Sequence, residues 1–191
     1  MNGPKLVLAS ASPRRLALLA QIGLTPDRVH PTEIDETPLP RELPRTHAER
    51  LARAKLDAVE APGCFVLAAD TVVAAGRRIL PKAATEAQAR ACLTLLSGRR
   101  HRVMTAVVLR APDARRAHRL VESVVGFARL TPAQLRAYLE SGEWQGKAGG
   151  YAIQGHAASF IRFLSGSYSN VVGLPLFETA QLLRGLGWPM P

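Results

Sequence analysis

The chain has 191 residues, 47% of them hydrophobic and 21% charged, which is typical of one folded domain over residues 1–191 and excludes a disordered chain. The net charge of +10 favours a polyanionic partner, but aromatic residues are only 5% of the chain and do not alternate with basic ones, which argues against nucleic acid. No apolar run approaches the roughly 18 residues that cross a bilayer, and the first apolar segment is too short for a signal peptide, so we expect a cytoplasmic protein without membrane contact.

Strand and helix signals alternate along the first part of the chain. In order, we predict a strand at Lys5–Ala9, a helix from Ser12 to about Gln21, an irregular or extended segment at 26–45, and a helix from Thr46 to about Val59. Ser12 is a typical N-cap and precedes a proline, whereas the second helix is predicted from a capping box, Thr46 to Glu49. Five prolines exclude regular helix from the segment between them.

The rest of the chain mixes longer strands with helices. In order, we predict a strand at Phe65–Ala69 that continues through Val72–Ala75, a hairpin turn at Gly76-Arg77, a helix at Thr85–Leu96, strands at His101–Arg110 and Ala117–Phe127, a helix from Thr131 to near Gly142, a glycine-rich loop at Gly146–Gly155 that runs into a strand, and a last helix from Pro175 to about Leu186. This mixture predicts an α/β protein. Cys64 and Cys92 lie in apolar stretches without CxxC spacing, so we expect buried free thiols.

The first candidate site is the segment from Ser10 to Arg15, which ends the first strand and opens the first helix. A helix N-terminus carries partial positive charge, so two arginines in its first turn are unfavourable unless an anion lies over them. Backbone N–H groups, serine hydroxyls and the guanidinium groups of Arg14 and Arg15 would together suit a phosphate chain. The alternative is that both arginines point into solvent. The segment is not a P-loop, because the GxxxxGK[ST] pattern is missing.

Acidic residues form the second and third candidates. Asp70 ends an apolar strand, where a carboxylate is costly unless a cation or metal pairs with it. Acids at strand ends often bind metals or act as general bases, although a structural aspartate that caps a turn or pairs with an arginine is the alternative. Glu33, Asp35 and Glu36 lie in the proline-rich segment. They could hold Mg²⁺ or Mn²⁺ over phosphates, but acids in irregular segments are usually just solvated.

Two lysines and the glycine-rich loop complete the candidates. Lys55 lies within a predicted helix and Lys82 follows the predicted hairpin; each by itself is more typical of a surface lysine than of a phosphate ligand. In the loop Gly146–Gly155, glycines would let the backbone approach a ligand closely, and Gln154 could read the edge of a base through paired hydrogen bonds. A loop this long and rich in glycine is more typical of function than of a plain turn.

These motifs together resemble the Maf-like nucleotide pyrophosphatases. The matching stretches, in chain order, are Leu8–Arg15, Leu51–Lys55, Ala69–Thr71, Leu96–Gly98, Lys147–Gly155 and Gly166–Pro175. The resemblance implies a mixed twisted sheet with flanking helices and two lobes around a cleft, distantly like the inosine triphosphate pyrophosphatases. It also implies a divalent cation, Mg²⁺ or Mn²⁺, a cytoplasmic location and a homodimer.

The resemblance also points to a subgroup. Members that act on dTTP and UTP carry arginine after Ser-Pro, threonine after the aspartate and Ile-Gln in the glycine loop, where this chain has Arg14, Thr71 and Gln154. The subgroup that acts on 7-methyl-GTP has tryptophan, glutamine and Ser-Glu at those places. The resemblance therefore favours dTTP and UTP, or modified pyrimidine nucleotides, as substrates.

Residue roles follow from the resemblance position by position. Asp70 would be the catalytic carboxylate, and Glu36 its companion at the metal, with Glu33 as the alternative companion. The residues that would bind the substrate are Ser10, Arg14, Arg15, Lys55, Thr71, Lys82 and Gln154. Lys82 stands in Pro-Lys-Ala where the family usually has Gly-Lys-Pro, and Arg129 is one residue out of step with a family arginine, so Arg129 receives no role.

The predicted reaction is hydrolysis of a nucleoside triphosphate between its α and β phosphates, which releases the monophosphate and pyrophosphate. Metal, arginine and lysine would neutralise the triphosphate, and a carboxylate would orient or deprotonate the attacking water. One alternative is a nucleotide-binding regulator of septum formation without significant turnover. The other is a nucleic-acid-binding protein, whose affinity would fall steeply with salt.

Overall fold

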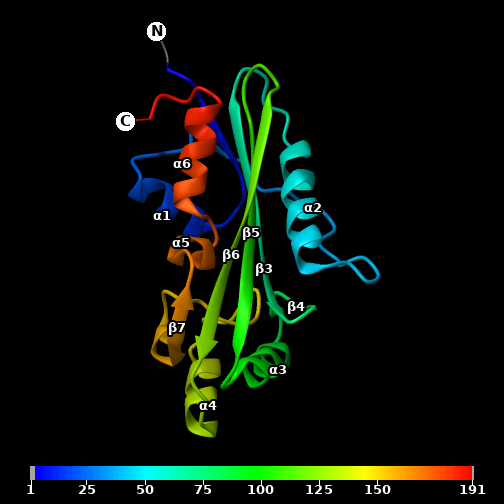
Figure 1. Cartoon of the computed structure of the whole chain (residues 1–191), viewed down its shortest axis with the longest axis vertical. Helices are drawn as coiled ribbons and strands as arrows, with labels where there is room; N and C mark the ends of the chain where they lie inside the picture. The colour runs from blue at the N-terminus through cyan, green and yellow to red at the C-terminus, as the bar shows by residue number, and fades with distance from the viewer. Residues whose placement is uncertain (1–2, 191) are drawn as a thin grey trace.

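The computed structural model describes residues 3–190, and strands and helices alternate along this part of the chain (Figure 1). The elements are β1 Leu6–Ala9, α1 Pro13–Gln21, β2 Arg28–Val29, α2 Pro44–Asp57, β3 Phe65–Ala75, β4 Arg78–Leu80, α3 Glu86–Leu96, β5 Arg100–Arg110, β6 Arg116–Phe127, α4 Pro132–Glu140, the 3₁₀ helix η1 His156–Phe160, β7 Ile161–Ser165, α5 Tyr168–Val172 and α6 Leu176–Gly185. The α/β class expected from the sequence is confirmed.

One mixed sheet organises these elements. Within residues 3–190 it has seven strands, in the order β2-β1-β3-β5-β6-β7, with β4 paired to β3. β1 pairs in parallel with β2 and β3, whereas β3, β5, β6 and β7 pair antiparallel in succession. The long helix α2 lies between β1 and β3 in the chain, as a parallel connection requires, and a short turn joins β5 to β6.

Helices cover both faces of the upper half of the sheet (Figure 1). α1 and α6 pack on one face and α2 packs on the other. Leu6 and Leu8 of β1 face α1 and α6, while Val7 and Ala9 face α2, because successive side chains of a strand point to opposite faces. A strand buried on both faces carries no polar positions, which is why β1 is an unbroken apolar run.

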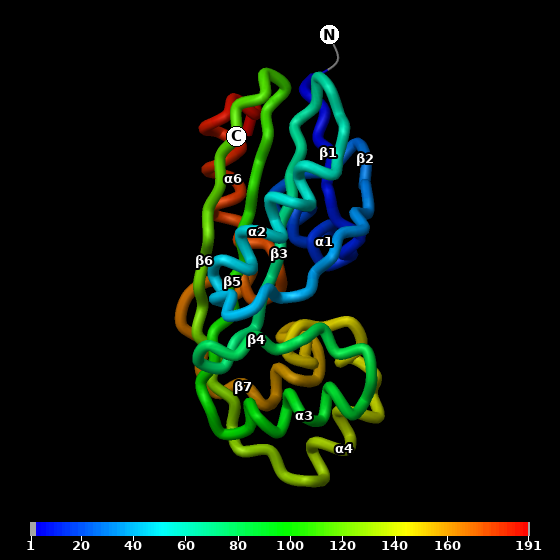
Figure 2. The backbone as a smooth tube through the Cα atoms, turned by 90° about the vertical axis from the view of Figure 1, so that its right-hand side faces the viewer, coloured from blue at the N-terminus to red at the C-terminus, as the bar shows by residue number. Residues whose placement is uncertain are grey.

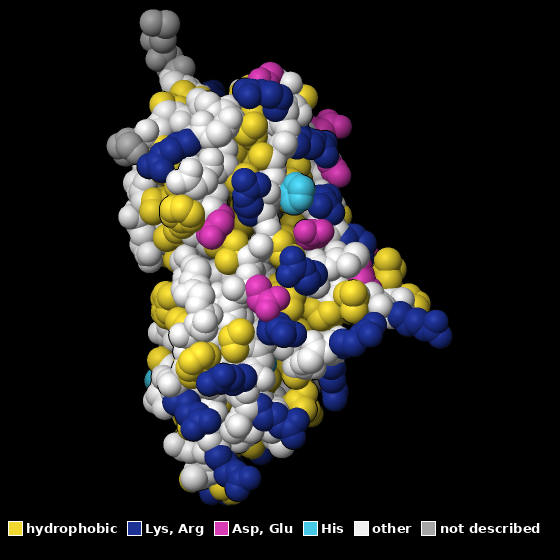
Figure 3. Space-filling view, viewed as in Figure 1, with side chains coloured by type: hydrophobic (Ala, Val, Ile, Leu, Met, Phe, Trp, Pro, Cys, Tyr) yellow, Lys and Arg dark blue, Asp and Glu magenta, His cyan; other side chains and the backbone are white. Residues whose placement is uncertain are grey.

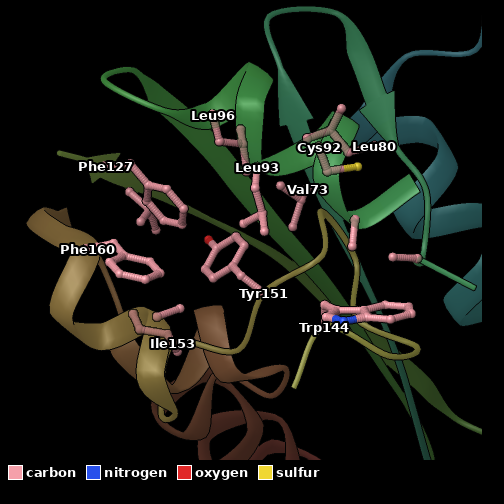
Figure 4. Close-up of a cluster of buried hydrophobic side chains, with 14 of the residues drawn as sticks. Val73, Leu80, Cys92, Leu93, Leu96, Phe127, Trp144, Tyr151, Ile153 and Phe160 are labelled. Carbon is pink, nitrogen blue, oxygen red and sulfur yellow. The ribbon is translucent and has the colours of Figure 1, made fainter. Parts of the chain in front are cut away.

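A separate core fills the lower half of the molecule, where α3, α4 and β7 gather around the ends of the long strands (Figure 2). Figure 4 shows the Tyr151 ring among Leu93, Phe127 and Phe160. The Tyr151 and Phe127 rings meet edge to face with their centroids 4.9 Å apart. The helices around the upper half of the sheet form the upper lobe, and α3, α4, η1 and β7 form the lower lobe, so the expected two-lobed architecture is confirmed.

The structure corrects the start of one helix and the end of the glycine-rich loop. α2 begins at Pro44 with Leu43 as its N-cap, so Thr46 and Glu49 do not form the expected capping box. Proline suits the first helical position because its missing N–H would have had no partner there, and this allows the earlier start. Ser12 does precede α1 as its N-cap, but its side chain makes no capping bond within the described chain. The glycine-rich loop leads into η1 rather than directly into a strand.

Two further features depart from expectation. The short helix α5 was not predicted; Ser167 caps it by accepting a hydrogen bond from the Asn170 N–H at 3.2 Å. Both cysteines are free, as expected, but only Cys92 is buried, whereas Cys64 is partly exposed. Within residues 3–190, each helix is too short or too polar to cross a membrane.

Candidate active site

The candidate site lies at a gap along one edge of β3. β1 pairs with β3 as far as Ala68, and β4 pairs with it from Val73 onward, so 69–72 have no strand partner on that edge in the described chain. Within this gap, Asp70 points to the α2 face of the sheet and Thr71 points to the opposite face, toward α5. The parallel strand β1 also ends here, and the carboxyl ends of parallel strands are where α/β sheets bind ligands.

A cleft of about 380 Å³ opens at this gap between the two lobes. The nine residues to which the resemblance gave a role line it: Ser10, Arg14, Arg15, Glu36, Lys55, Asp70, Thr71, Lys82 and Gln154. They come from the β1–α1 segment, the proline-rich segment, α2, β3, the segment after β4 and the glycine-rich loop, which are far apart in the chain. Asp35, the third acid of the proline-rich segment, is exposed and does not line the cleft. Glu33 and Arg129 are exposed and are not among the cleft-lining residues.

Lys55 joins the two carboxylates of the cleft. Its Nζ lies 2.6 Å from Asp70 Oδ1 and 2.6 Å from Glu36 Oε1, and Lys82 bonds the other oxygen of Glu36. The Asp70 side chain is 2% exposed and the Lys55 side chain 7%, so this ion pair is almost entirely shielded from water. Burial raises the pKa of Glu36, but hydrogen bonds from Lys55 and Lys82 outweigh it and lower that pKa to about 2. Glu36 therefore faces the cleft as an anion, and Asp70 contacts the same Lys55 ammonium group.

These donors fit a divalent cation that is shared with a phosphate ligand. Mg²⁺ in phosphate-transfer sites is usually held by one or two carboxylates, with phosphate oxygens and water completing the shell. Asp70 and Glu36 provide such a pair. In the part of the chain that the structure describes, no cluster of three or more histidine, cysteine or acidic side chains could enclose a metal by itself. The donor set therefore suits an ion that arrives with its substrate.

Arg15 is buried and holds the cleft together. Its Nε donates to the Gly173 carbonyl at 2.9 Å, and its Nη1 donates to Ser10 Oγ at 2.9 Å. Its Nη2 lies 3.4 Å from Thr71 Oγ1. Burial lowers the pKa of the Arg15 guanidinium, and the nearby Asp70 charge opposes that shift. Arg15 therefore links α1, β3 and the turn after α5, and the solvent-exposed alternative is wrong for it.

Arg14 differs from its neighbour. It is half-buried in the cleft, and burial lowers its pKa. Lys147 and Thr32, which sequence reasoning did not assign, also line the cleft. Burial, followed by the charge of Arg14, lowers the pKa of Lys147. Neither Arg14 nor Lys147 forms an ion pair with a carboxylate of residues 3–190, so two partly desolvated cations face the same cleft. An anionic ligand would relieve this repulsion.

The glycine-rich loop is fastened to the segment that carries Lys82. The Ala83 N–H donates to the Lys147 carbonyl at 3.1 Å, and the Gly149 N–H donates to the Pro81 carbonyl at 3.0 Å. Gly149 has a φ of +69°, and a Cβ there would lie 2.8 Å from a methyl group of Val73. Only glycine fits this conformation and this close approach. The two segments thus bring Lys82, Lys147 and the exposed Gln154 to one wall of the cleft.

Basic residues outnumber acidic ones in the chain, 25 to 15. On the face shown in Figure 3, Lys and Arg gather over the lower end of the molecule, whereas Asp and Glu lie nearer the middle and the top. A surface on which charges of one sign predominate raises the local concentration of ligands of opposite charge. The net charge of +10 therefore favours the approach of a polyanion.

The two arginines should respond differently to substitution. We expect Arg15→Met to destabilise the protein by roughly 2–4 kcal/mol, because it leaves the buried Gly173 carbonyl and Ser10 hydroxyl without a charged donor. Arg14→Met should change stability by less than about 1 kcal/mol, because Arg14 is half-buried and makes no comparable hydrogen bond to any of residues 3–190. Urea unfolding of both variants measures this difference. Equal losses in the free energy of unfolding would contradict the structural role of Arg15.

Acid should remove the stabilisation that Glu36 provides. Because its pKa is lowered in the folded protein, to about 2, the contribution is present above the ordinary glutamate pKa and is lost as the pH falls toward about 2. We expect the difference in free energy of unfolding between the wild type and Glu36→Gln to shrink from about pH 5 to about pH 3. Urea titrations in EDTA at several pH values measure this. A difference that stays constant over that range would show that Lys55 and Lys82 do not stabilise the carboxylate.

Comparison with known proteins agrees with this geometry. The family model described as "Maf-like protein" matches residues 5–186. A dTTP/UTP pyrophosphatase of Caulobacter vibrioides is 65% identical over 188 residues, which cover 97% of each chain. One of Granulibacter bethesdensis is also 65% identical and covers 96% of this chain and 93% of its own.

Solved structures are similar at a greater distance. The Staphylococcus aureus Ham1 protein aligns with a TM-score of 0.44 and 17% identity, over 65% of this chain and 72% of its own. The assignment to a family rests instead on the family model, which spans nearly the whole chain, and on the two close relatives. The chain therefore belongs to the Maf-like protein family.

Proposed function

We propose that the protein is a dTTP/UTP pyrophosphatase, which hydrolyses the bond between the α and β phosphates and releases a nucleoside monophosphate and pyrophosphate. The observation that carries the proposal is the arrangement of the cleft: two carboxylates bridged by Lys55 share it with two cations, Arg14 and Lys147, that form no close ion pair with a carboxylate of residues 3–190. The names of the close relatives support the substrate.

In this proposal the cations of the chain bind and orient the triphosphate. Arg14, Lys82 and Lys147 line the cleft where they would neutralise phosphate oxygens, and the Ser10 hydroxyl and the N-terminus of α1 add hydrogen-bond donors. Charge neutralisation and alignment are the main contributions that a protein makes to phosphoryl transfer. Lys82 and Lys147 would stabilise the charge that develops on the departing pyrophosphate.

The carboxylates act on the attacking water. Asp70 would hold this water beside the α phosphate and accept its proton, because its carboxylate is almost fully buried and held in place by Lys55 at 2.6 Å. Asp70 and Glu36 would hold a divalent cation, Mg²⁺ or Mn²⁺, which would supply further charge neutralisation at the phosphates. Lys55 keeps the two carboxylates from repelling one another before the ligand arrives.

The glycine-rich loop would determine which nucleobase the cleft accepts. Gln154 is exposed in the cleft wall and has an amide that can donate and accept at once, as the edge of uracil or thymine requires. Thr71 lies on the opposite side of β3 from Asp70, where its hydroxyl lies 2.9 Å from the Thr105 hydroxyl and can donate to the Gly173 carbonyl at 3.4 Å. It would therefore shape the cleft wall through these contacts.

A screen for pyrophosphate release tests the proposal. Nucleoside triphosphates, canonical and modified, are incubated with Mg²⁺ or Mn²⁺, and we expect dTTP and UTP to be hydrolysed fastest. Activity should be lost in excess EDTA after bound metal is stripped. Nucleotide binding without turnover would favour a regulator of septum formation instead. Binding to nucleic acid that falls steeply with salt would favour the third alternative.

We further propose that the chain acts as one domain, in the cytoplasm, and as a homodimer. The charge and the nucleotide substrate support the location, and the exposed aromatic side chains Tyr168 and Phe177 offer apolar surface to a second copy. Light scattering on the purified protein measures the mass directly. A monomer at micromolar concentration would contradict the homodimer.

A further inference from the structure

The segment that carries Glu36 has little regular structure to hold it. After β2 ends at Val29, the chain has no helix or strand until α2 begins at Pro44. Glu36 nevertheless reaches Lys55 with its carboxylate oxygen 2.6 Å away. Next to it, Asp35 Oδ1 accepts a hydrogen bond from the Thr37 N–H at 2.8 Å, which closes a local turn. We define residues 35–43 as the acidic arm and ask what fixes it against the body of the protein.

A buried ionic cluster lies at the far end of the acidic arm. The Glu42 side chain is only 4% exposed. Arg50 makes a bidentate ion pair with its carboxylate, with Nε 2.7 Å from Oε1 and Nη2 2.8 Å from Oε2. His47 Nδ1 lies 2.8 Å from the same Oε2 and the His47 side chain is 5% exposed. The hydrogen bond from Arg50 is the first cause that lowers the pKa of Glu42, to about 2. Glu42 is therefore a buried anion with well-matched donors.

The cluster also forms hydrogen bonds with the backbone of the acidic arm. The Leu39 N–H donates to Glu42 Oε2 at 3.0 Å, and Arg50 Nη2 donates to the Thr37 carbonyl at 3.0 Å. Between Leu39 and Glu42 the chain passes through Arg41, whose φ of 60° is a strained conformation for a residue with a side chain and persists only when its surroundings hold it. Thr37 directly follows Glu36, so the cluster fixes the peptide beside the acidic side chain of the cleft.

The geometry points to Glu42 as a positioning residue for Glu36. Arg50 and Lys55 lie on the same helix, α2, five residues apart. Lys55 holds the Glu36 carboxylate, and the same Arg50 Nη2 that donates to Glu42 also donates to the Thr37 carbonyl. We propose that the Glu42–Arg50 pair sets the position at which Glu36 meets Lys55 and Asp70, although Glu42 does not itself touch the substrate. The inference rests on the role of Glu36 in the proposed function.

The test is a double-mutant cycle of Glu36→Gln and Glu42→Gln. The first readout is Mn²⁺ affinity in the presence of a non-hydrolysable UTP analogue, measured by electron paramagnetic resonance, which does not require turnover. We expect Glu42→Gln alone to weaken Mn²⁺ binding and to lower kcat/KM for UTP by about 10- to 100-fold, because small misplacements in a site are costly. In the Glu36→Gln background the same change should weaken Mn²⁺ binding less than about twofold.

Hydrogen exchange provides a readout that is independent of metal and turnover. In Glu42→Gln we expect the amides of Thr37 and Leu39 to exchange faster, while the amides of β3 remain protected. Glu49→Gln is the matched control, because Glu49 lies on α2 and forms a surface ion pair with Arg53 at 3.6 Å. It should leave both the exchange of the acidic arm and the Mn²⁺ affinity unchanged.

Several outcomes would overturn the inference. Equal losses of Mn²⁺ affinity in the wild-type and Glu36→Gln backgrounds would show that Glu42 acts on stability rather than on Glu36. Unchanged hydrogen exchange of the acidic arm in Glu42→Gln would also show that Glu42 does not position Glu36. If Glu42→Gln does not fold, Arg50→Lys replaces it, because Arg50 is 31% exposed and lysine cannot make the two-pronged contact. Failure of the proposed function is distinguishable, because a wild-type protein without pyrophosphate release leaves the exchange result intact.

Discussion

Asp70→Asn should lower kcat by roughly 10²- to 10⁴-fold, the usual contribution of a general base. Asparagine keeps the size of aspartate and much of its hydrogen bonding, but it has neither the charge nor the basicity. The protein should stay folded. Lys55 loses one of its two carboxylate partners but keeps Glu36 at 2.6 Å, so no buried charge is left unpaired.

A thermal melting curve measures the stability of Asp70→Asn, and a progress curve of pyrophosphate release measures its kcat. The control is Asp57→Asn, since Asp57 is about half exposed and forms its ion pair with Arg116 at the surface, 2.7 Å away. That variant should keep its turnover and lose little stability. A folded Asp70→Asn protein with turnover close to that of the wild type would remove Asp70 from the mechanism. A loss of activity that merely follows the folded fraction would make Asp70 structural.

Lys55→Met should be the most destabilising single change in the cleft, at about 3–5 kcal/mol. It removes the cation that Asp70 and Glu36 share and leaves two carboxylates facing one another, one of them almost fully buried. Methionine has nearly the length of lysine, so little of the loss would come from packing. Urea unfolding in EDTA measures the effect, and activity should fall with it.

Lys82→Met is the matched control for that change. Lys82 also pairs with Glu36, but its side chain is 46% exposed, so water replaces most of what it provides. We expect a stability loss below about 1 kcal/mol, together with a higher KM for the nucleotide. If Lys55→Met and Lys82→Met destabilise the protein equally, the buried bridge between Asp70 and Glu36 has no special role. The double variant Lys55→Met/Asp70→Asn should recover part of the stability, because it removes one of the two repelling charges.

Local signals in the sequence determined most of the secondary structure. The helices expected from Thr85 and from Thr131 both form: a capping box at Thr131 starts α4, with both reciprocal hydrogen bonds, and Thr85 caps α3. Gly76-Arg77 does turn β3 into β4. These signals succeed because they depend on contacts within a few residues. The start of α2 could not be predicted from local signals, because Pro44 and Thr46 are both suitable first residues of a helix. The packing of the helix decides between them.

The sequence by itself also singled out residues that the fold brings to one cleft, since arginines at a helix N-terminus and an acid at the end of an apolar strand are unfavourable without a ligand or a counter-charge. Only the tertiary structure decided how they are paired. It separated Arg15, a buried brace, from Arg14, a cation open to the cleft, and it placed Glu36 rather than Glu33 beside Lys55. It also revealed Lys147 in the cleft and the buried Glu42–Arg50 pair. Contacts between residues far apart in the chain arise because β1 pairs with β3 and the glycine-rich loop bonds to the segment after β4, and no local pattern encodes them.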